Sequence, residues 1–364
     1  MRHRFHSLCP YFAMFPETFV ETWVNRLTKP GTVVLDPFCG RGTTPFQSLL
    51  MDRIVIASDI NPVAYCITKA KTNAPTAKAL RRRITELEKR FDARSWEPAR
   101  RAMPEFFHHA YATATLRQLL YLRNRLSWEF NNTDCMLAAL VLGSLHGETQ
   151  KSKSYLSSQM PRTISTKPAY SVRFWRMHKL QPPERDAFAL LRDRVTFRYE
   201  SDPPEGRGTV IKSDMRELPR LLDEFDKPIR CVITSPPYLD VTNFEEDQWL
   251  RLWFLRGKPY PTYRTVSRDD RHENAEKYWD MISDMWRVLG KVLAKKADIV
   301  IRLGGKDFDT EGMGQRLQAT SIFSRRKAEL VHSETSEIQR RQTDSFRPGS
   351  KGCRIEADFH FRLN

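Results

Sequence analysis

The sequence of 364 residues contains no run of about 18 apolar residues, so nothing in it predicts a membrane-spanning helix. Its basic N-terminus, MRHRFHSLCPYF, lacks the apolar stretch of a secretory signal. There is also no internal repeat and no extended low-complexity tract. In the absence of a membrane span or a signal, we expect a cytoplasmic protein with no membrane contact.

Cysteine is scarce, and no two cysteines form a CxxC pair. The six residues are scattered along the chain, at Cys9, Cys39, Cys66, Cys135, Cys231 and Cys353. This spacing matches neither a disulfide framework nor a zinc site. We therefore expect reduced, mostly buried thiols and no metal ion.

Acidic residues are outnumbered by basic ones. The chain has 60 Lys and Arg residues against 44 Asp and Glu residues, which gives a net charge of +16. Such an excess attracts polyanions and favours contacts with a phosphate backbone. Because charge alone fits equally well a basic protein kept soluble by its surface, it supports a nucleic-acid partner without proving one.

Short apolar runs alternate with helical patterns in two parts of the chain. Residues 31–71 give a strand, a Gly-rich turn, a helix, a second strand and a second helix. The alternation resumes with strands at 208–215, 229–238 and 297–305, helices at 247–255 and 276–293, and two closing strands at 327–338 and 353–364. Short apolar runs bounded by turns are typical of buried parallel strands. The pattern predicts an α/β fold with a mostly parallel central sheet covered on both faces.

An insert of different character separates these two parts. Residues 76–205 open with a charged helix at 77–91, continue with one or two amphipathic helices over 106–148, and end in a basic stretch rich in proline, serine and aromatics. We therefore expect a catalytic domain made of residues 1–75 and 206–364, with a helical, loop-rich insert at 76–205.

A glycine-rich turn, LDPFCGRGTT at 35–44, follows the first predicted strand. Gly40 and Gly42 let the backbone turn tightly, so that N–H groups and a helix N-terminus can face a cofactor at the carboxyl end of the strand. The string is not a GxGxxG, and no GKS or GKT follows it, so neither a dinucleotide fingerprint nor a P-loop matches. Taken alone, it is equally consistent with a structural turn.

Acidic residues end the next two strands of the series. Asp59 lies about twenty residues after the glycines, where a carboxylate can hold ribose hydroxyls, although it could instead cap the helix near Pro62. Asp214 ends the third strand, where it could accept a hydrogen bond from an adenine amino group or cap the helix at Arg216.

The motif TSPPY at 234–238 lies at the end of another buried strand. Pro236 and Pro237 fix the backbone and remove two N–H donors, which leaves carbonyl groups and the Ser235 hydroxyl as acceptors beside the ring of Tyr238. Acceptors next to a stacking ring suit a base whose exocyclic amine must be held. An isolated string of this kind is otherwise a rigid loop with a core tyrosine.

Together, these motifs resemble the amino-methyltransferases of DNA, whose cofactor motif is F-x-G-x-G and whose catalytic motif is Ser, Asp or Asn followed by Pro-Pro and an aromatic residue. HSLCPYFAMFPETFVE resembles the family's additional cofactor segment. The resemblance covers residues 6–75 and 208–305. It implies a Rossmann-like S-adenosylmethionine methyltransferase fold and S-adenosyl-L-methionine as the cofactor, bound by Tyr11, Phe12, Phe15, Asp36, Pro37, Phe38, Gly40, Gly42, Thr43, Asp59, Ile60, Asp214 and Met215.

The resemblance also implies the reaction. Ser235, Pro236, Pro237 and Tyr238 correspond to the catalytic motif, and serine before the prolines resembles the N4-cytosine subset most. A base inside a duplex is out of reach, so it would be flipped out, with Tyr238 stacking on it. Three alternatives stay open: N6-adenine in DNA, an amino group in RNA, and a nucleic-acid-binding protein that kept the fold and lost turnover.

Double-stranded DNA is the implied partner, and a cognate restriction endonuclease or a defence-system partner stays open. In this family the target-recognition region usually lies near or beyond the catalytic motif, whereas the insert of this chain precedes the third strand. We predict from length and charge that 76–205 recognises the target. Phosphate contacts are expected from the basic residues of its last part, Lys151, Lys153, Arg162, Lys167, Arg173, Arg176 and Lys179.

Overall fold

The computed structural model describes residues 2–11, 15–148, 155–160, 167–239, 244–262, 275–305, 309–337 and 355–364. The chain forms two compact units, which are treated separately below. A sheet unit comprises Ala13–Thr68, Pro204–Asn243 and Val266–Asn364, and a helical unit comprises Met1–Phe12, Lys69–Pro203 and Phe244–Thr265. The helical unit thus contains most of the predicted insert together with residues 1–12, 69–75 and 244–265 from outside it.

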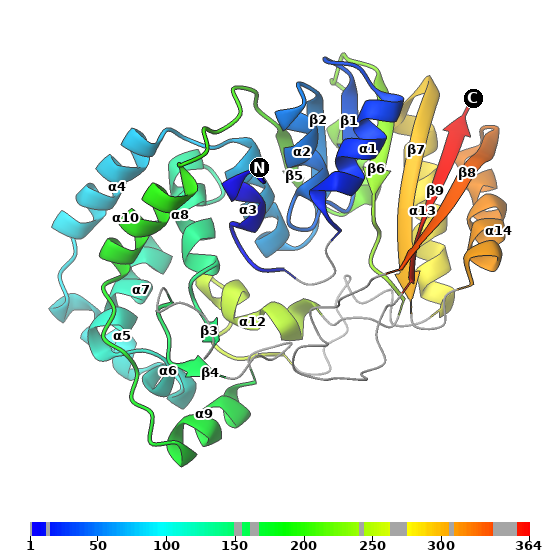
Figure 1. Cartoon of the computed structure of the whole chain (residues 1–364). Coiled ribbons are helices and arrows are strands. Elements are labelled where there is room, and N and C mark those ends of the chain that lie inside the picture. Colours follow the sequence, from blue (N-terminus) through cyan, green and yellow to red (C-terminus); the bar gives the residue numbers. More distant parts are fainter. Residues whose placement is uncertain are drawn as a thin grey trace. The chain divides into compact units, whose positions relative to one another are not determined.

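The sheet unit is built on seven strands in the order β5-β2-β1-β6-β7-β9-β8 (Figure 1). β1, β2, β5, β6 and β7 are parallel, whereas β9 runs antiparallel between β7 and β8. The strands are β1 (Val33–Asp36), β2 (Ile54–Asp59), β5 (Thr209–Lys212), β6 (Ile229–Thr234), β7 (Leu293–Gly305), β8 (Ala328–Glu337) and β9 (Ile355–Leu363). The prediction of a mostly parallel sheet is confirmed.

Helices bury both faces of this sheet, which explains why its central strands are apolar almost throughout. On one face, α1 (Glu17–Leu27) packs Val20, Trp23 and Val24 against the strands. The opposite face is covered by α13 (Ala275–Val292), α14 (Thr310–Thr320) and the short α11 (Leu218–Leu221). Two more helices, α2 (Thr43–Leu50) and α3 (Pro62–Thr72), follow β1 and β2, as the alternating pattern predicts.

The strand order defines a Rossmann-like methyltransferase fold: a doubly wound parallel sheet closed by an antiparallel strand at the end that holds β7 and β8. From β1 the chain winds outward through β2 to β5, then returns to place β6 on the other side of β1. The order of winding therefore reverses between β1 and β6. Ligands of open α/β sheets bind at such a point, outside the carboxyl ends of the strands.

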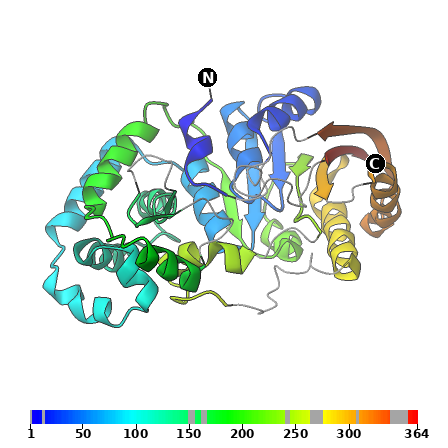
Figure 2. The same ribbon diagram turned by 60° about the horizontal axis from the view of Figure 1, so that its bottom comes forward.

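In the part of the helical unit that the structure describes, the sheet is limited to the short pair β3 (Gly147–Glu148) and β4 (Gln159–Met160) (Figures 1 and 2). Thr76 caps α4, and Leu80, Ile84 and Leu87 are buried along one stripe of that helix. Between residues 106 and 148 the chain forms parts of three helices rather than the predicted one or two. The helices of this unit are α4 (Ala77–Lys89), α5 (Glu97–Arg101), α6 (Glu105–Ala110), α7 (Thr113–Arg125), α8 (Asn132–Leu142), α9 (Pro168–Met177), α10 (Ala187–Arg198) and α12 (Phe244–Phe254).

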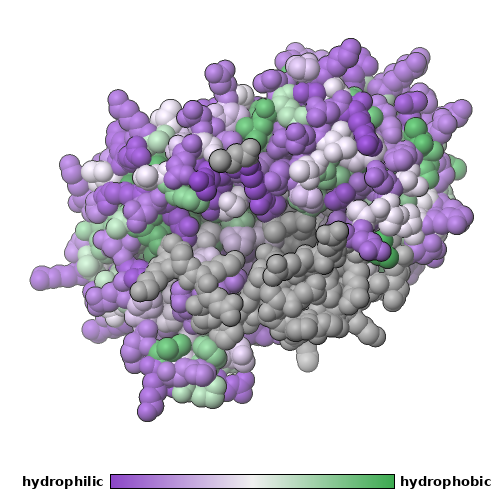
Figure 3. Space-filling view, in the orientation of Figure 1, coloured by the Kyte–Doolittle hydropathy of each residue, from purple (hydrophilic) through white to green (hydrophobic). Residues whose placement is uncertain are grey.

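The exterior is polar on the side drawn in Figure 3, where apolar residues occur only in small groups. Across the described ranges, no helix has the length and hydropathy needed to cross a bilayer. The same residues hold no group of three His, Cys, Asp or Glu side chains that could bind a metal ion.

Candidate functional site

The glycine-rich turn after β1 forms a tight loop at the switch point. Gly40 and Gly42 both have positive φ, +48° and +73°. A side chain at Gly42 would also meet the Thr68 hydroxyl at 2.5 Å, and that hydroxyl donates to the Gly40 carbonyl at 3.1 Å. Only glycine fits there without strain, so the sequence pattern reflects a real backbone constraint. The loop ends at the N-terminus of α2, where Thr43 is buried.

Asp36, at the end of β1, joins this loop to the catalytic motif. Its Oδ1 accepts a hydrogen bond of 2.6 Å from the Thr234 hydroxyl and another of 3.2 Å from the Phe38 N–H. Thr234 is fully buried and immediately precedes Ser235. Asp36 Oδ2 is buried with no hydrogen-bond partner among the described residues, so it has acceptor capacity left. The two predicted motifs are therefore in direct contact.

Asp59 ties the end of β2 to the same loop. Its Oδ2 accepts from the Gly40 N–H at 2.8 Å, and its Oδ1 accepts from the Asn61 N–H at 2.9 Å. The sequence left open whether this side chain holds a ligand or caps a helix. In the structure each of its oxygens accepts one hydrogen bond from a backbone N–H group. Each carboxylate oxygen can accept a further hydrogen bond.

Both carboxyl groups have a raised pKa. Burial raises the pKa of Asp36 to about 6, although the Thr234 hydroxyl and the Phe38 N–H partly offset the effect. Burial likewise raises the pKa of Asp59 to about 6, against the lowering effect of the Asn61 and Gly40 N–H groups. Carboxylates desolvated at the carboxyl edge of a sheet are typical of binding sites.

Three further cofactor predictions fall at the ends of β2 and β5. Ile60 is 36% exposed beside Asp59, which is unusual for isoleucine and leaves an apolar surface at the sheet edge. Asp214 caps a 3₁₀ turn by accepting from the Arg216 N–H at 3.0 Å, and it also pairs with the Arg216 guanidinium. Met215 is buried in the core below α13. The adenine contact predicted for Asp214 stays a prediction.

The predicted cofactor residues just before α1 are less closely tied to this site. Tyr11 is buried in the helical unit, and Phe12 lies outside the described residues. Phe15 belongs to the sheet unit and packs edge-on against Phe19 of α1, with ring centroids 5.0 Å apart. Their contact with a cofactor stays a prediction.

The catalytic motif leaves the end of β6 and turns Tyr238 inward. Ser235 is partly exposed, whereas Tyr238 is only 8% exposed. The Ser235 hydroxyl donates to the Tyr238 hydroxyl at 3.3 Å, and the Tyr238 hydroxyl donates to Glu356 Oε1 of β9 at 3.0 Å. The sequence predicts a stacking ring at this position, and the structure adds a hydrogen bond that anchors it.

Glu356 belongs to a buried network of ion pairs with Arg302 and Asp358. Arg302 of β7 lies 3.3 Å from Glu356 and makes a two-pronged pair with Asp358, at 2.6 and 2.9 Å. The indole N–H of Trp23 approaches Asp358 at 3.4 Å, and the Phe19 ring lies 3.8 Å below the Arg302 guanidinium. These groups line a hollow of about 440 Å³ between α1 and the ends of β7, β8 and β9.

The sequence analysis did not predict Arg302, Glu356 or Asp358 as residues of the site. The sequence predicts a closing strand at 353–364 but does not single out Glu356 or Asp358. In the structure β9 lies between β7 and β8, and most of its residues on both faces are buried. Arg302, the one charge in the apolar run IVIRLGG, was the available signal, because a charge inside a buried strand needs a buried partner.

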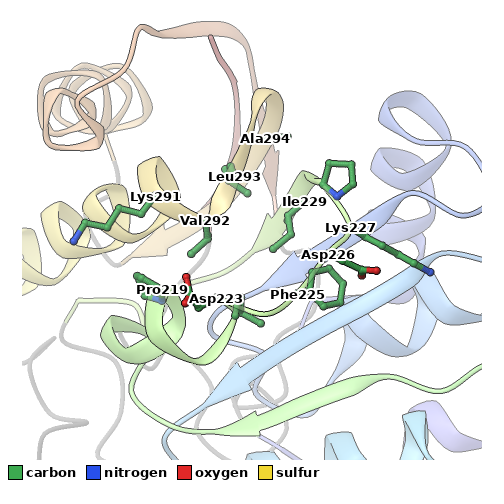
Figure 4. A pocket seen from close by; sticks show the side chains of 12 residues that line it. Pro219, Asp223, Phe225, Asp226, Lys227, Ile229, Lys291, Val292, Leu293 and Ala294 are labelled. Carbon is green, nitrogen blue, oxygen red and sulfur yellow. The ribbon is translucent and has the colours of Figure 1, made fainter.

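A second hollow, of about 520 Å³, lies at the other end of the strands, where β6 and β7 begin (Figure 4). Its wall is formed by the segment that leads into β6 and by the junction of α13 with β7, including Asp223, Phe225, Ile229 and Val292. It borders the amino ends of β6 and β7, and none of the predicted site residues that the structure describes is among its lining residues.

The predicted phosphate-contacting residues are only partly covered by the structure. Lys151, Lys153 and Arg162 lie outside the described residues. Lys167, Arg173, Arg176 and Lys179 lie on or beside α9 and are all exposed. Arg176 pairs with Glu105, and Lys167 lies 4.0 Å from Glu246. The adjacent Trp175 is fully buried and belongs to the core of the helical unit.

Comparison with known proteins agrees with the motifs. Residues 3–70 match the family model of the N6/N4 methyltransferases, described as DNA methylase. Over 82 residues the chain is 29% identical to the type II methyltransferase M.MjaII of Methanocaldococcus jannaschii, which covers 22% of this chain and 16% of that protein.

Similarity to solved structures is weak. The rRNA methyltransferase aviRa from Streptomyces viridochromogenes aligns over 97% of this chain and 87% of its own, with 15% identity and a TM-score of 0.35. TrmN from Thermus thermophilus aligns over 96% of this chain and 49% of its own, with 10% identity and a TM-score of 0.36. TM-scores this low establish neither a shared fold nor a shared function.

The strand order and the loop at the switch point are those of a Rossmann-like methyltransferase fold. Residues 3–70 match the DNA methylase family model, and the motifs at 35–44 and 234–238 are similar to those of the DNA amino-methyltransferases. Family and fold imply S-adenosylmethionine as the cofactor. The residues present fit it: the loop has no side chain at Gly40 and Gly42, and Asp36 Oδ2 is a buried acceptor with no partner among the described residues.

We expect Thr234→Val to destabilise the sheet unit, because it removes the hydroxyl that serves the buried Asp36 carboxylate. A hydrogen bond to a charged group contributes roughly 1.5–3 kcal/mol, so the free energy of unfolding in urea should fall by about that amount. Thr209→Val, at an exposed strand position, is the matched control. Equal effects of the two substitutions would contradict the assigned role.

The raised pKa of Asp36 predicts a pH-dependent difference between the wild type and Asp36→Asn. The folded pKa of about 6 exceeds the unfolded value, so this group contributes stability that is complete below about pH 4 and is lost as pH rises through 6. Between pH 4 and 7, the free energy of unfolding should shift in favour of the variant by about 2–3 kcal/mol. Asp223→Asn, at an exposed position, is the control, and a pH-independent difference for Asp36→Asn would refute the prediction.

Proposed function

We propose that this protein transfers a methyl group from S-adenosylmethionine to the exocyclic N4 of cytosine in DNA, after flipping the base out of the duplex. The observation that carries the proposal is the contact between the two motifs at the switch point. Thr234, one residue before Ser235, is bonded to Asp36 at the start of the glycine-rich loop. Acceptors for an amine and a loop suited to the cofactor thus lie on adjacent strands.

The cofactor, when bound, supplies an electrophilic methyl group on a sulfonium sulfur. Asp36, Phe38, Gly40 and Gly42 would hold its methionine end, and Asp59 would accept from its ribose hydroxyls. The Ser235 hydroxyl and the Pro236 carbonyl would accept from the amino hydrogens of the target base, which turns the nitrogen lone pair toward the methyl group. Transfer is then a direct displacement that depends on alignment. Serine is a weak base, so the proton leaves to solvent.

The choice of target rests on one residue. Serine in front of the two prolines favours N4 of cytosine, whereas the matched family includes both N4 and N6 enzymes. N6 of adenine keeps every step above and changes only the shape of the base pocket. Two alternatives make the same use of the cofactor loop: an enzyme that methylates an amino group in RNA, and a protein that binds DNA without methylating it.

The deciding experiment is methyl transfer from labelled S-adenosylmethionine to unmodified genomic DNA, followed by nucleoside mass spectrometry. We expect N4-methylcytosine. N6-methyladenine would move the target and leave the mechanism intact. Cofactor binding without a methylated product on DNA or RNA would refute the proposed activity.

Ser235→Ala should separate chemistry from cofactor binding. Losing an acceptor that aligns the nucleophile is expected to lower kcat by roughly 100-fold. Ser235 makes no described contact with the loop at 36–42, so the Kd for S-adenosylmethionine, measured by calorimetry, should stay within about twofold. Ser213→Ala, after β5, serves as the control substitution. Parallel loss of kcat and cofactor affinity would contradict the separation of roles.

We propose that the basic residues around α9 contact the phosphate backbone, as part of a target-recognition region within 76–205. Neutralising Lys167, Arg173 and Lys179 together should weaken DNA binding and flatten its salt dependence. Each lost phosphate contact reduces the slope of log K against log salt by about 0.9. The matched control is Lys291, Lys295 and Lys296, which are exposed near the start of β7. An equal change in both triple variants would indicate only an effect of net charge.

A further inference from the structure

Three side chains form a hydrogen-bonded chain that leads inward from the catalytic motif. Ser235 and Tyr238 belong to the segment after β6, and Glu356 lies on β9. The oxygens of Ser235 and Tyr238 are 3.3 Å apart, and those of Tyr238 and Glu356 are 3.0 Å apart. Tyr238 and Glu356 are less than one tenth exposed, so their bonds are shielded from water.

The order of donors and acceptors in this chain follows from chemistry. An ionised carboxylate has no proton to give, so the Tyr238 hydroxyl must donate to Glu356. A phenol has only one proton, so its oxygen can only accept from Ser235. The Ser235 hydroxyl therefore donates its only proton to Tyr238. On the side that faces solvent, the Ser235 oxygen has only lone pairs and can only accept a hydrogen bond. Burial raises the pKa of Tyr238 well above its usual range, so the phenol keeps its proton.

We propose that Glu356 is a positioning residue that, through Tyr238, makes the Ser235 oxygen an obligatory hydrogen-bond acceptor for the target group. This inference rests on the proposed function and narrows it: the site would accept a group that brings N–H donors, such as an exocyclic amine. A carbonyl at the same place would meet lone pairs and be repelled. Glu356 of β9 would thus contribute to the preference for a base with an amino group, although Tyr238 and Ser235 lie between it and the base.

Ion pairing fixes the carboxylate that sets this direction. Arg302 lies 3.3 Å from Glu356 Oε2, on the oxygen that Tyr238 does not use. Arg302 itself is held by its two-pronged pair with Asp358 and by the Phe19 ring. Burial raises the pKa of Glu356, and the neighbouring Arg302 cation opposes that rise. Arg302 therefore fixes the position of Glu356 and favours the ionised form that the proposed direction requires.

The first experiment is a double-mutant cycle with Tyr238→Phe and Glu356→Gln, on the DNA that the wild type methylates. A glutamine can donate as well as accept, so the direction of the chain is no longer forced. We expect each single variant to lower kcat about tenfold with KM for DNA nearly unchanged, and the double variant to match the worse single one. Glu337→Gln, an exposed position on β8 at the same hollow, should keep wild-type kcat.

Multiplying effects, with roughly 100-fold loss in the double variant, would overturn the proposal because the two residues would then act independently. If Glu356→Gln fails to fold, the cycle is made with Ser235→Ala and Tyr238→Phe. The expected result there is that Tyr238→Phe costs nothing further once the Ser235 hydroxyl is gone.

A second measurement tests the hydrogen bonds among Ser235, Tyr238 and Glu356 without requiring catalytic activity. The Glu356 carboxyl carbon is titrated by ¹³C NMR in the wild type and in Tyr238→Phe. Besides Tyr238, the charged groups around it are Arg302 of β7, Asp358 of β9 itself, and Glu334 and Glu337 of β8 at the same hollow. Loss of the phenol donor should raise the pKa of Glu356, and an unchanged titration would refute the chain. A wild type that methylates no nucleic acid would refute the proposed function, while this titration still tests the hydrogen bonds.

Discussion

The hydrogen bond from the Thr234 hydroxyl to Asp36 is the contact on which the arrangement of the site depends. It joins the carboxyl ends of β1 and β6, the two strands between which the winding of the sheet reverses. The loop from Asp36 to Gly42 and the motif from Ser235 to Tyr238 both begin within one residue of that bond. A shift of either strand end would separate the acceptors for the amine from the cofactor loop.

Burying acidic groups at this edge opposes folding. Asp36, Asp59 and Glu356 are all desolvated, and burial raises the pKa of each. Backbone N–H groups, hydroxyls and Arg302 compensate for part of that penalty. Carboxylates of this kind are retained where a ligand or a neighbouring side chain needs a strong acceptor, which agrees with their position around the glycine-rich loop and the catalytic motif.

The antiparallel strand β9 connects the architecture to the chemistry. Its apolar side chains, Phe359 and Phe361, pack into the core below α13, while Glu356 and Asp358 face α1. Because side chains alternate along a strand, one element can complete a core and also carry the ion-pair network behind Tyr238. The ends of β7 and β9 that carry Arg302 and Glu356 are therefore part of the candidate site and do not only support it.

The sequence by itself determined the α/β class and the motifs, because short apolar runs, glycines in tight turns and paired prolines are local constraints that leave a local pattern. It missed Thr234, Arg302, Glu356 and Asp358 as site residues. Their roles depend on which strands are neighbours, and strand order is not a local property. Asp36 and Thr234 are 198 positions apart in the chain and meet only because the winding reverses at β1. The tertiary structure alone decided that meeting, along with the burial of Glu356 and Asp358 on β9 beside Arg302.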